Sequence, residues 1–150
     1  MQLQIRAIGK LKKNTPEFAI ITDYIKKTRW SVEVKEYEEK KALTGLELEQ
    51  AEAKLLLKDL PTNAYVIALD EHGKTLSSRE LADTLRPHAD KPLVFIIGGA
   101  DGLDESVRER ANLILSFGRM TLPHFLMRAV LAEQIYRIRT LWDGHPYHRD

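Results

Sequence analysis

Three turns rich in glycine and polar residues each follow an apolar run, and their composition suits ligand binding. They are Leu69 to Lys74, Gly98 to Leu103 and Gly118 to His124. Glycine allows positive φ and lets a backbone approach a ligand closely. The spacing matches neither the Gly-x-Gly-x-x-Gly of dinucleotide folds nor the Gly-Lys-Ser/Thr of a P-loop, so phosphate cofactors of these two kinds are disfavoured. A tight turn without a ligand explains the Gly-Gly-x-x-Gly segment equally well.

A second group of reactive side chains lies near the C-terminus. His124 and Arg128 are spaced i, i+4 at the start of an expected helix and therefore share a face. The segment His145-Pro-Tyr-His-Arg149 combines groups that can stack on a nucleobase and hold a phosphate. A packed or frayed terminus is the alternative. A zinc site at His145 and His148 is disfavoured, because no cysteine and no well-placed third ligand accompany them.

Charge is balanced overall but unevenly distributed. The 150 residues carry 23 basic and 22 acidic side chains, a net charge of +1, which excludes the strong field of a nonspecific DNA-coating protein. No lysine follows Lys91, whereas arginines continue to Arg149. Arginine suits phosphate or RNA contacts, but taken alone this bias is explained better by ordinary arginines on helix surfaces. The absence of cysteine excludes a disulfide framework, a thiol nucleophile, Cys-ligated zinc and iron-sulfur clusters.

The scaffold that would bring the three turns together follows from the apolar pattern. Strands are expected near residues 3–8, 30–37, 64–69, 93–97 and 113–117, with helices from residue 16 and near 46–60, 77–88, 104–112 and 124–142. The third and fourth strands are continuous apolar runs, typical of central parallel strands. We therefore expect one α/β domain over residues 1–150, a mostly parallel sheet flanked by helices. In such folds ligands bind beyond the carboxyl ends of the strands.

The last expected helix is apolar nearly all round, which predicts one face against its own sheet and another against a partner chain. The polar and apolar residues of Met1 to Arg6 alternate, so no signal peptide is expected. No stretch approaches the roughly 20 apolar residues of a membrane-spanning helix. These features predict a cytoplasmic homo-oligomer without a membrane partner.

Four ordered motifs carry a resemblance to a known family. They are Leu69-Asp-Glu-His-Gly-Lys-Thr-Leu-Ser-Ser78, Ile96-Ile-Gly-Gly-Ala-Asp-Gly-Leu103, Leu122-Pro-His-Phe-Leu-Met-Arg128 with Glu133-Gln-Ile-Tyr-Arg137, and His145-Pro-Tyr-His-Arg149. Over essentially the whole chain they resemble the RlmH family, the pseudouridine N3-methyltransferases of 23S ribosomal RNA within the SPOUT superfamily. The resemblance implies a homodimer, a C-terminal trefoil knot, S-adenosylmethionine as cofactor and no metal. It also implies methylation in the helix 69 loop, on the ribosome.

Site residues follow when the resemblance is carried over position by position. The implied cofactor contacts are Leu69, Gly98, Phe117, Gly118, Arg119, Met120, Thr121 and Leu122. A side chain at Gly98 is expected to occupy cofactor space. The residues expected to bind substrate are His124, Arg128, His145, Tyr147 and Arg149, and those expected to be catalytic are Tyr147, His148 and Arg149.

The chemistry requires help from the protein, because an imide N3 is a poor nucleophile while it carries its proton. A general base or a cationic partner should add on the order of 10²–10⁴-fold. The possible bases are His124, His148 and Asp150 with the terminal carboxylate, and the tail is favoured as the element that faces the substrate. The alternative functions are a non-catalytic RNA- or ribosome-binding α/β module and a small-molecule sensor that uses the same turns.

Overall fold

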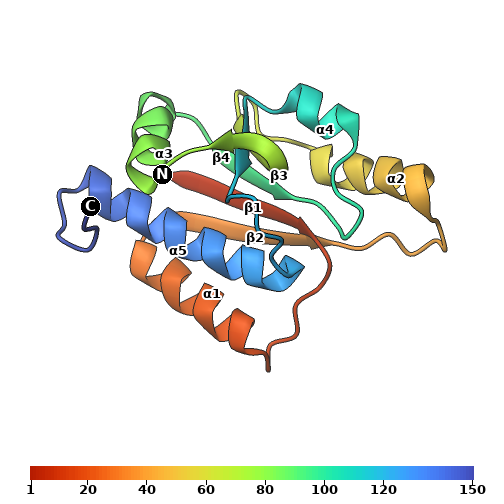
Figure 1. The fold of residues 1–150 in the computed structure, drawn as a ribbon, viewed down its shortest axis with the longest axis horizontal. Helices are drawn as coiled ribbons and strands as arrows, with labels where there is room; N and C mark the ends of the chain where they lie inside the picture. The colour runs from red at the N-terminus through yellow and green to blue at the C-terminus, as the bar shows by residue number, and fades with distance from the viewer.

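Five parallel strands form one sheet in the order β2-β1-β4-β3-β5 (Figure 1). The computed structural model describes residues 1–150. The strands are β1 (Gln2–Ile8), β2 (Ser31–Tyr37), β3 (Tyr65–Thr75), β4 (Leu93–Ile97) and β5 (Leu113–Ser116). The helices are α1 (Pro16–Thr28), α2 (Gly45–Leu57), α3 (Ser78–Leu85) with a 3₁₀ turn at Arg86–His88, α4 (Glu105–Arg110) and α5 (His124–Trp142). The predicted α/β class with a parallel sheet is confirmed.

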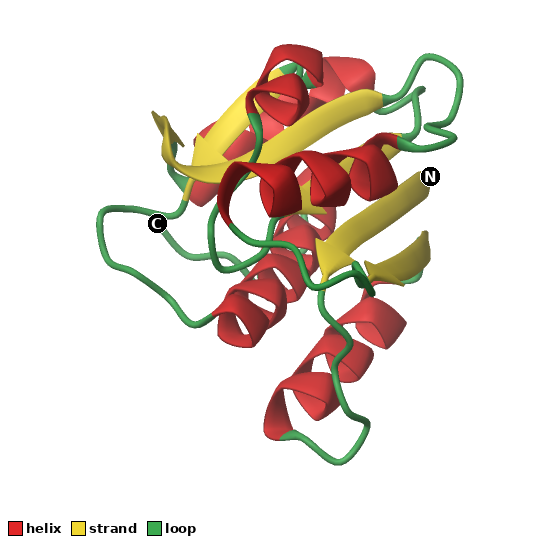
Figure 2. Ribbon diagram, turned by 90° about the vertical axis from the view of Figure 1, so that its right-hand side faces the viewer, coloured by secondary structure: helices red, strands yellow, loops and turns green.

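Helices cover both faces of the sheet (Figure 2). On one face α3 and α5 pack over the central strands, and Leu131 and Phe95 belong to the same buried cluster. On the other face α2 and α4 pack through Leu56 and Val107, which share a cluster with Val94. Because β4 is buried on both faces, its side chains are apolar throughout, as its sequence predicted. The carboxyl ends of the strands are left for the connecting loops.

The predicted helix over 46–60 is three residues too long, because a buried arginine ends α2 at Leu57. The Arg6 side chain is fully buried and donates hydrogen bonds to Leu56 O (2.9 Å), Lys58 O (2.6 Å) and Asp59 O (3.1 Å). These carbonyls lie at and beyond the end of α2, where the last carbonyls of a helix lack backbone partners. A guanidinium from β1 therefore replaces the final turn of the expected helix.

The structure corrects the prediction that β3 ends at Leu69 and a turn follows. The strand continues to Thr75, and both Leu69 and Lys74 pair with Leu115 of β5. The intervening residues form a bulge. A Cβ at Gly73 would lie 2.6 Å from the Ile114 backbone, so only glycine allows the two strands to approach this closely. The bulge leaves the residues after Leu69 at the carboxyl end of the sheet, where the loops meet.

The second apolar face of α5 is covered largely within the same chain, which corrects the argument that it needs a partner chain. Figure 1 shows α1 lying alongside α5, and Ile21 of α1 shares a buried cluster with Ala129 and Ala132 of α5. What remains exposed is smaller: Leu126 is 40% and Ile20 41% accessible. None of the helices is long and apolar enough to cross a membrane.

Candidate functional site

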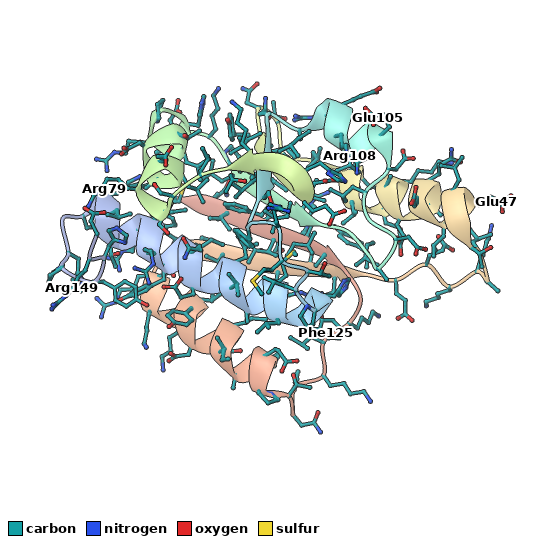
Figure 3. The ribbon with its side chains drawn as sticks, viewed as in Figure 1. Glu47, Arg79, Glu105, Arg108, Phe125 and Arg149 are labelled. Carbon is teal, nitrogen blue, oxygen red and sulfur yellow. The ribbon has the colours of Figure 1, made fainter.

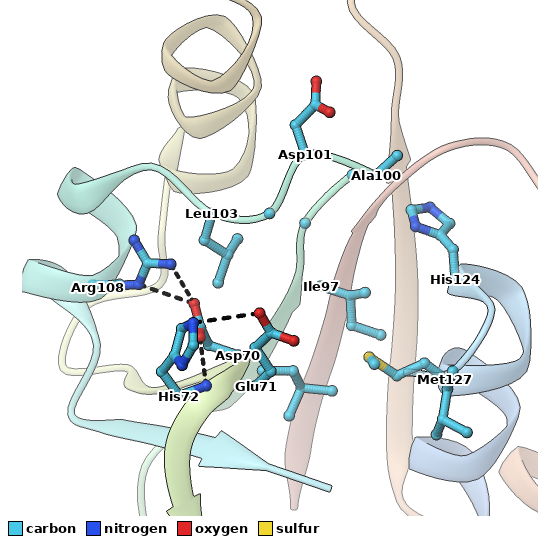
Figure 4. Close-up of a pocket in the computed structure, with 15 residues that line it drawn as sticks. Asp70, Glu71, His72, Ile97, Ala100, Asp101, Leu103, Arg108, His124 and Met127 are labelled. Carbon is cyan, nitrogen blue, oxygen red and sulfur yellow. Dashed lines mark hydrogen bonds and ion pairs between the residues drawn. The ribbon is translucent and has the colours of Figure 1, made fainter. Parts of the chain in front are cut away.

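A cavity of about 600 Å³ opens at the carboxyl ends of β3 and β4 (Figure 4). Its walls come from four segments: the β3 bulge at Leu69–His72, the loop Ile97–Leu103 after β4, Arg108 of α4, and the start of α5 with the residues before it. The predicted meeting of the turns at one edge of the sheet is confirmed. The reason is geometric, since parallel strands place all their carboxyl ends at the same edge.

A second cavity of about 90 Å³ adjoins the first and shares part of its wall, including Leu69, Leu122 and Met127. Of the eight residues predicted to contact a cofactor, seven line these two cavities. Leu69, Gly98 and Leu122 line the larger one, and Phe117, Gly118, Met120 and Thr121 line the smaller one. Arg119 lines neither.

The cavity walls carry backbone groups without partners. No hydrogen bond within the chain is donated by the amides of residues 98–101 or 119–122. By contrast, Gly102 N donates to Gly99 O (3.1 Å) and Gly118 N to Ser116 Oγ (3.0 Å). All of these residues are exposed or partly exposed, so their amides are open to water or to a ligand in the cavity. These amides are therefore the donors that a bound ligand would meet.

The structure changes the expected reason for glycine at position 98. A Cβ built on Gly98 would lie 2.7 Å from Leu103 Cδ2 and 2.9 Å from Gly102 O. It would point into the loop that walls the cavity, rather than into the cavity itself. A side chain at this position would therefore displace the loop.

An ion pair between Asp70 of the β3 bulge and Arg108 of α4 stabilises another part of the cavity wall. Asp70 Oδ2 accepts a hydrogen bond from Arg108 Nε (2.9 Å), and Asp70 Oδ1 accepts one from His72 N (2.8 Å), as the dashed lines in Figure 4 show. Burial acts to raise the pKa of Asp70, but the hydrogen bonds from His72 and Arg108 outweigh it and hold the pKa below its ordinary value. Asp70 is therefore a charged, fully paired carboxylate that shapes the wall and is unsuited to act as a base.

His124 lines the cavity, whereas Arg128 does not. The Nε2 atom of His124 lies 2.6 Å from Ile8 O and must donate to this carbonyl, which leaves Nδ1 unpaired. The Arg128 side chain is 1% exposed, pairs with Glu36 and donates to Gly9 O (3.1 Å). Arg128 joins α5 to the ends of β1 and β2, and its Nε, which has no partner, is buried away from the cavity surface. In this position Arg128 has a structural role, and the substrate contact expected of it would need the side chain to leave its partners.

The C-terminal tail, residues 145–150, is anchored at the other end of α5. Figure 3 labels Phe125 near one end of α5 and Arg149 near the other. Tyr147 Oη donates to Glu133 Oε1 (3.0 Å), and the Arg137 guanidinium lies 4.8 Å from the centre of the Tyr147 ring. Burial and hydrogen bonds with Tyr24 and Glu133 raise the pKa of Tyr147, so its hydroxyl keeps its proton. Glu133 also forms an ion pair with Arg137, four residues further along α5, which is part of this anchor.

Both ring nitrogens of His148 are also engaged. Arg137 Nη1 lies 3.1 Å from Nδ1, and Asp150 Oδ1 lies 2.8 Å from Nε2. Arginine only donates, so Nδ1 accepts and Nε2 carries the proton. Asp150 is in turn paired with Arg79 of α3 (2.7 Å). Arg149 is exposed and makes no hydrogen bond or ion pair, which leaves it as the free cation of the tail.

Within one chain, the structure does not bring the predicted catalytic residues to the cavity. Tyr147, His148 and Arg149 line neither cavity wall. His145 lines a separate hollow of about 530 Å³ between the ends of α1 and α5, beside Arg139. Arg108 is a wall residue that the sequence reasoning missed; its only signal was its position on the short helix directly after the glycine-rich loop. No cluster of three or more His, Asp or Glu side chains is placed to hold a metal ion.

Comparison with known proteins agrees with this geometry. A family model described as "Predicted SPOUT methyltransferase" matches residues 1–148. The ribosomal RNA large subunit methyltransferase H of Paramagnetospirillum magneticum is 48% identical over 152 residues, which cover 99% of each chain. Proteins of the same name from Rhodospirillum centenum and Rhodospirillum rubrum are 44% and 43% identical, with the same coverage.

Solved structures show the same fold at low sequence identity. The SpoU methyltransferase AviRb from Streptomyces viridochromogenes, crystallised in complex with the cofactor AdoMet, superimposes with a TM-score of 0.52 at 13% identity. A second structure of AviRb gives a TM-score of 0.53. The alignments span 92% and 96% of this chain but only 58% and 61% of AviRb. At this identity the likeness concerns the fold alone.

Proposed function

Because this chain belongs to the SPOUT methyltransferase family, we propose that it methylates N3 of a pseudouridine in the helix 69 loop of 23S ribosomal RNA. S-adenosylmethionine is the proposed methyl donor, and the ribosome is the proposed setting. The relatives' name, ribosomal RNA large subunit methyltransferase H, supports the substrate class. The single observation that carries the proposal is the pair of adjoining cavities at the carboxyl edge of the sheet, walled by unpartnered backbone amides.

The residues around these cavities fit S-adenosylmethionine. The larger cavity, about 600 Å³, is within the range of small-molecule sites. Its unpartnered donors are backbone amides next to glycines, which suit the neutral adenine and ribose of a cofactor without phosphates. Leu69, Gly98 and the run Phe117–Leu122 would hold the cofactor, and Arg119 would do so only through its backbone. When bound, S-adenosylmethionine supplies an electrophilic methyl group on a sulfonium.

The protein must then orient the target base and assist the loss of the proton from N3. Of the proposed bases, His124 alone lines the cavity, and its Nδ1 is unpaired. His148 is held by Arg137 and Asp150 and has no free ring nitrogen. We therefore propose that the tail orients the RNA, chiefly through the unpaired guanidinium of Arg149, with Tyr147 and His148 anchoring it. His145 would contribute from the neighbouring hollow.

A homodimer is part of the proposal, since the tail lies away from the cavities of its own chain. In this position the tail serves the cavity of a second copy, so that each RNA site contains residues of both chains. The exposed apolar side chains of Leu126 on α5 and Ile20 on α1 support a surface for this contact. Sedimentation at assay concentration should give a dimer; a monomer with full activity would contradict this part of the proposal.

The family resemblance also implies a trefoil knot and a cytoplasmic location, and both stay predictions. The segment after β5 begins at one edge of the sheet and returns to the end of β1, where His124 contacts Ile8. A connection that crosses the ends of several strands in this way supports a threaded topology. Ribosomal RNA as substrate supports a cytoplasmic location.

A labelled-methyl assay tests the function. Ribosomes lacking the modification are incubated with the protein and S-adenosylmethionine labelled on its methyl group, and the modified nucleoside is identified by mass spectrometry. We expect label in 23S RNA, on N3 of a pseudouridine in the helix 69 loop. Binding to ribosomes without incorporation of label would favour the non-catalytic RNA-binding module. Binding of S-adenosylmethionine without RNA methylation would favour a sensor.

A further inference from the structure

Glu52 of α2 is a largely buried residue whose carboxyl group has no partner within the chain, and the proposed mechanism does not use it. The residue is 8% exposed. Its carboxyl oxygens make no hydrogen bond or ion pair within the chain, but neither is among the fully buried unpaired side-chain atoms, so both keep some contact with water. Burying a carboxyl costs free energy unless hydrogen bonds or an opposite charge compensate. The fold therefore encloses most of the Glu52 side chain, and the limited contact of its carboxyl group with water makes ionisation less favourable.

The Glu52 carboxyl group lies directly behind the glycine-rich loop. A Cβ built on Gly99 would lie 2.9 Å from Glu52 Oε1 and 3.0 Å from Oε2, so the carboxyl fills the space that a side chain at this position would need. Gly99 lines the larger cavity, whereas Glu52 does not. The carboxyl therefore supports the loop from the side away from the cavity. The loop amides that it supports, those of residues 98–101, are the ones without partners.

The charged groups that face Glu52 are all acidic. Burial is the main effect that raises the pKa of Glu52 above its ordinary value of 4.5, and Asp101 of the same loop, Glu49 of α2 and Glu39 before α2 raise it further. No cation offsets them. The observed packing thus favours the uncharged carboxyl, whereas an ionised Glu52 gains by moving toward water and away from Gly99.

We propose that Glu52 is a positioning residue of the cofactor site: its carboxyl group, packed behind Gly99, holds the amides of residues 98–101 where they receive S-adenosylmethionine. This inference rests on the proposed function, because it assigns the loop to that cofactor. The sign of the pH dependence follows. The packing is fully favoured below the ordinary pKa of 4.5 and is lost as pH rises through the raised pKa, so cofactor affinity falls with rising pH.

Calorimetric titration with S-adenosylmethionine between about pH 5 and 8 tests the proposal. Glu52→Gln keeps the size of the side chain and cannot ionise; it should bind at least as tightly as wild type, with an affinity that no longer falls as pH rises. Glu52→Ala removes the support and should bind about tenfold more weakly. The matched control is Glu47→Gln, the same change on an exposed part of α2, which should keep the wild-type pH profile.

A second variant tests the contact itself. Gly99→Ala places a methyl group against the Glu52 carboxyl, and it should weaken cofactor binding in the wild-type background but much less in Glu52→Ala. Additive effects of the two substitutions would overturn the proposal. So would an unchanged pH profile in Glu52→Gln, or wild-type affinity in Glu52→Ala. If the wild-type protein does not bind S-adenosylmethionine, the proposed function is wrong as well. If the wild-type protein binds it and the Glu52 variants bind it equally well, only the role of Glu52 is wrong.

Discussion

The polar groups near the two ends of α5 differ in whether they have hydrogen-bond partners within the chain. At its start, the cavity is walled by backbone amides with no partner in the chain. At its end, the tail side chains are paired with one another and with Glu133, Arg137 and Arg79, and only Arg149 is free. Unpaired donors fixed in a wall suit the recognition of a small ligand. A paired tail is a surface element that is held in place and presents one cation.

The two ends of α5 should also differ in how strongly a substitution affects cofactor binding and stability. The cavity loops pack tightly enough that an added methyl group at Gly98 meets atoms within 3 Å. The tail rests on hydrogen bonds at a partly exposed surface, where each contributes little net stability. We therefore expect changes in the cavity wall to affect cofactor binding strongly, and single changes in the tail to affect stability weakly. Four substitutions or deletions test this contrast, in order of decreasing effect.

The first is Gly98→Val, which should reduce affinity for S-adenosylmethionine at least about a hundredfold, or about 2.7 kcal/mol. The added side chain overlaps Leu103 and the Gly102 backbone, so the loop must move. Calorimetry measures the affinity. The melting temperature of the same variant shows whether the rest of the fold survives, and wild-type affinity in the folded variant would contradict the assignment of this wall.

Deletion of residues 145–150 should lower the rate of methyl transfer at least about a hundredfold while cofactor binding and dimerisation persist. The reason is that the tail is proposed to orient the RNA and lies away from the cofactor cavities of its own chain. Labelled-methyl incorporation into ribosomes measures the rate. A near wild-type rate would leave the tail without a role in catalysis or substrate binding.

Asp70→Asn should lower the free energy of unfolding by about 1–3 kcal/mol at neutral pH, because it weakens the paired carboxylate in the cavity wall. The pKa of Asp70 is lowered, so this stability is present above the ordinary value of 3.8 and is lost as pH falls through the lowered pKa. Denaturant unfolding should therefore show the variant and wild type converging at acidic pH. Asp83→Asn, an exposed change on α3, serves as the control.

Tyr147→Phe should have the smallest effect, about 1 kcal/mol of stability, because it removes one hydrogen bond to Glu133 and keeps the ring against Tyr136 and Arg137. Denaturant unfolding measures it. If the variant instead lost methyl transfer as completely as the tail deletion, the Tyr147 hydroxyl would be a catalytic group and its anchoring role would be wrong.

Much of the scaffold was predictable because the signals are local. The apolar run at Leu93–Ile97 predicted β4 to the residue, and the start of α3 carries a capping box between Ser77 and Glu80, which are only three positions apart. The three turns that meet at the cavity could be identified because a parallel sheet places all strand ends at one edge. The boundaries that failed, at the ends of α2 and β3, depend on contacts from other segments.

The sequence by itself determined the elements, their order and the ligand-binding edge, since burial patterns, caps and glycine positions act over neighbouring residues. Only the tertiary structure decided the roles of individual polar side chains. Arg128, a candidate substrate-binding residue, is buried against Glu36, and Glu52, which belongs to no local motif, lies behind Gly99. These roles depend on partners 92 and 47 positions away along the chain. Residue type does not reveal such pairings, because they exist only once the helices have packed on the sheet.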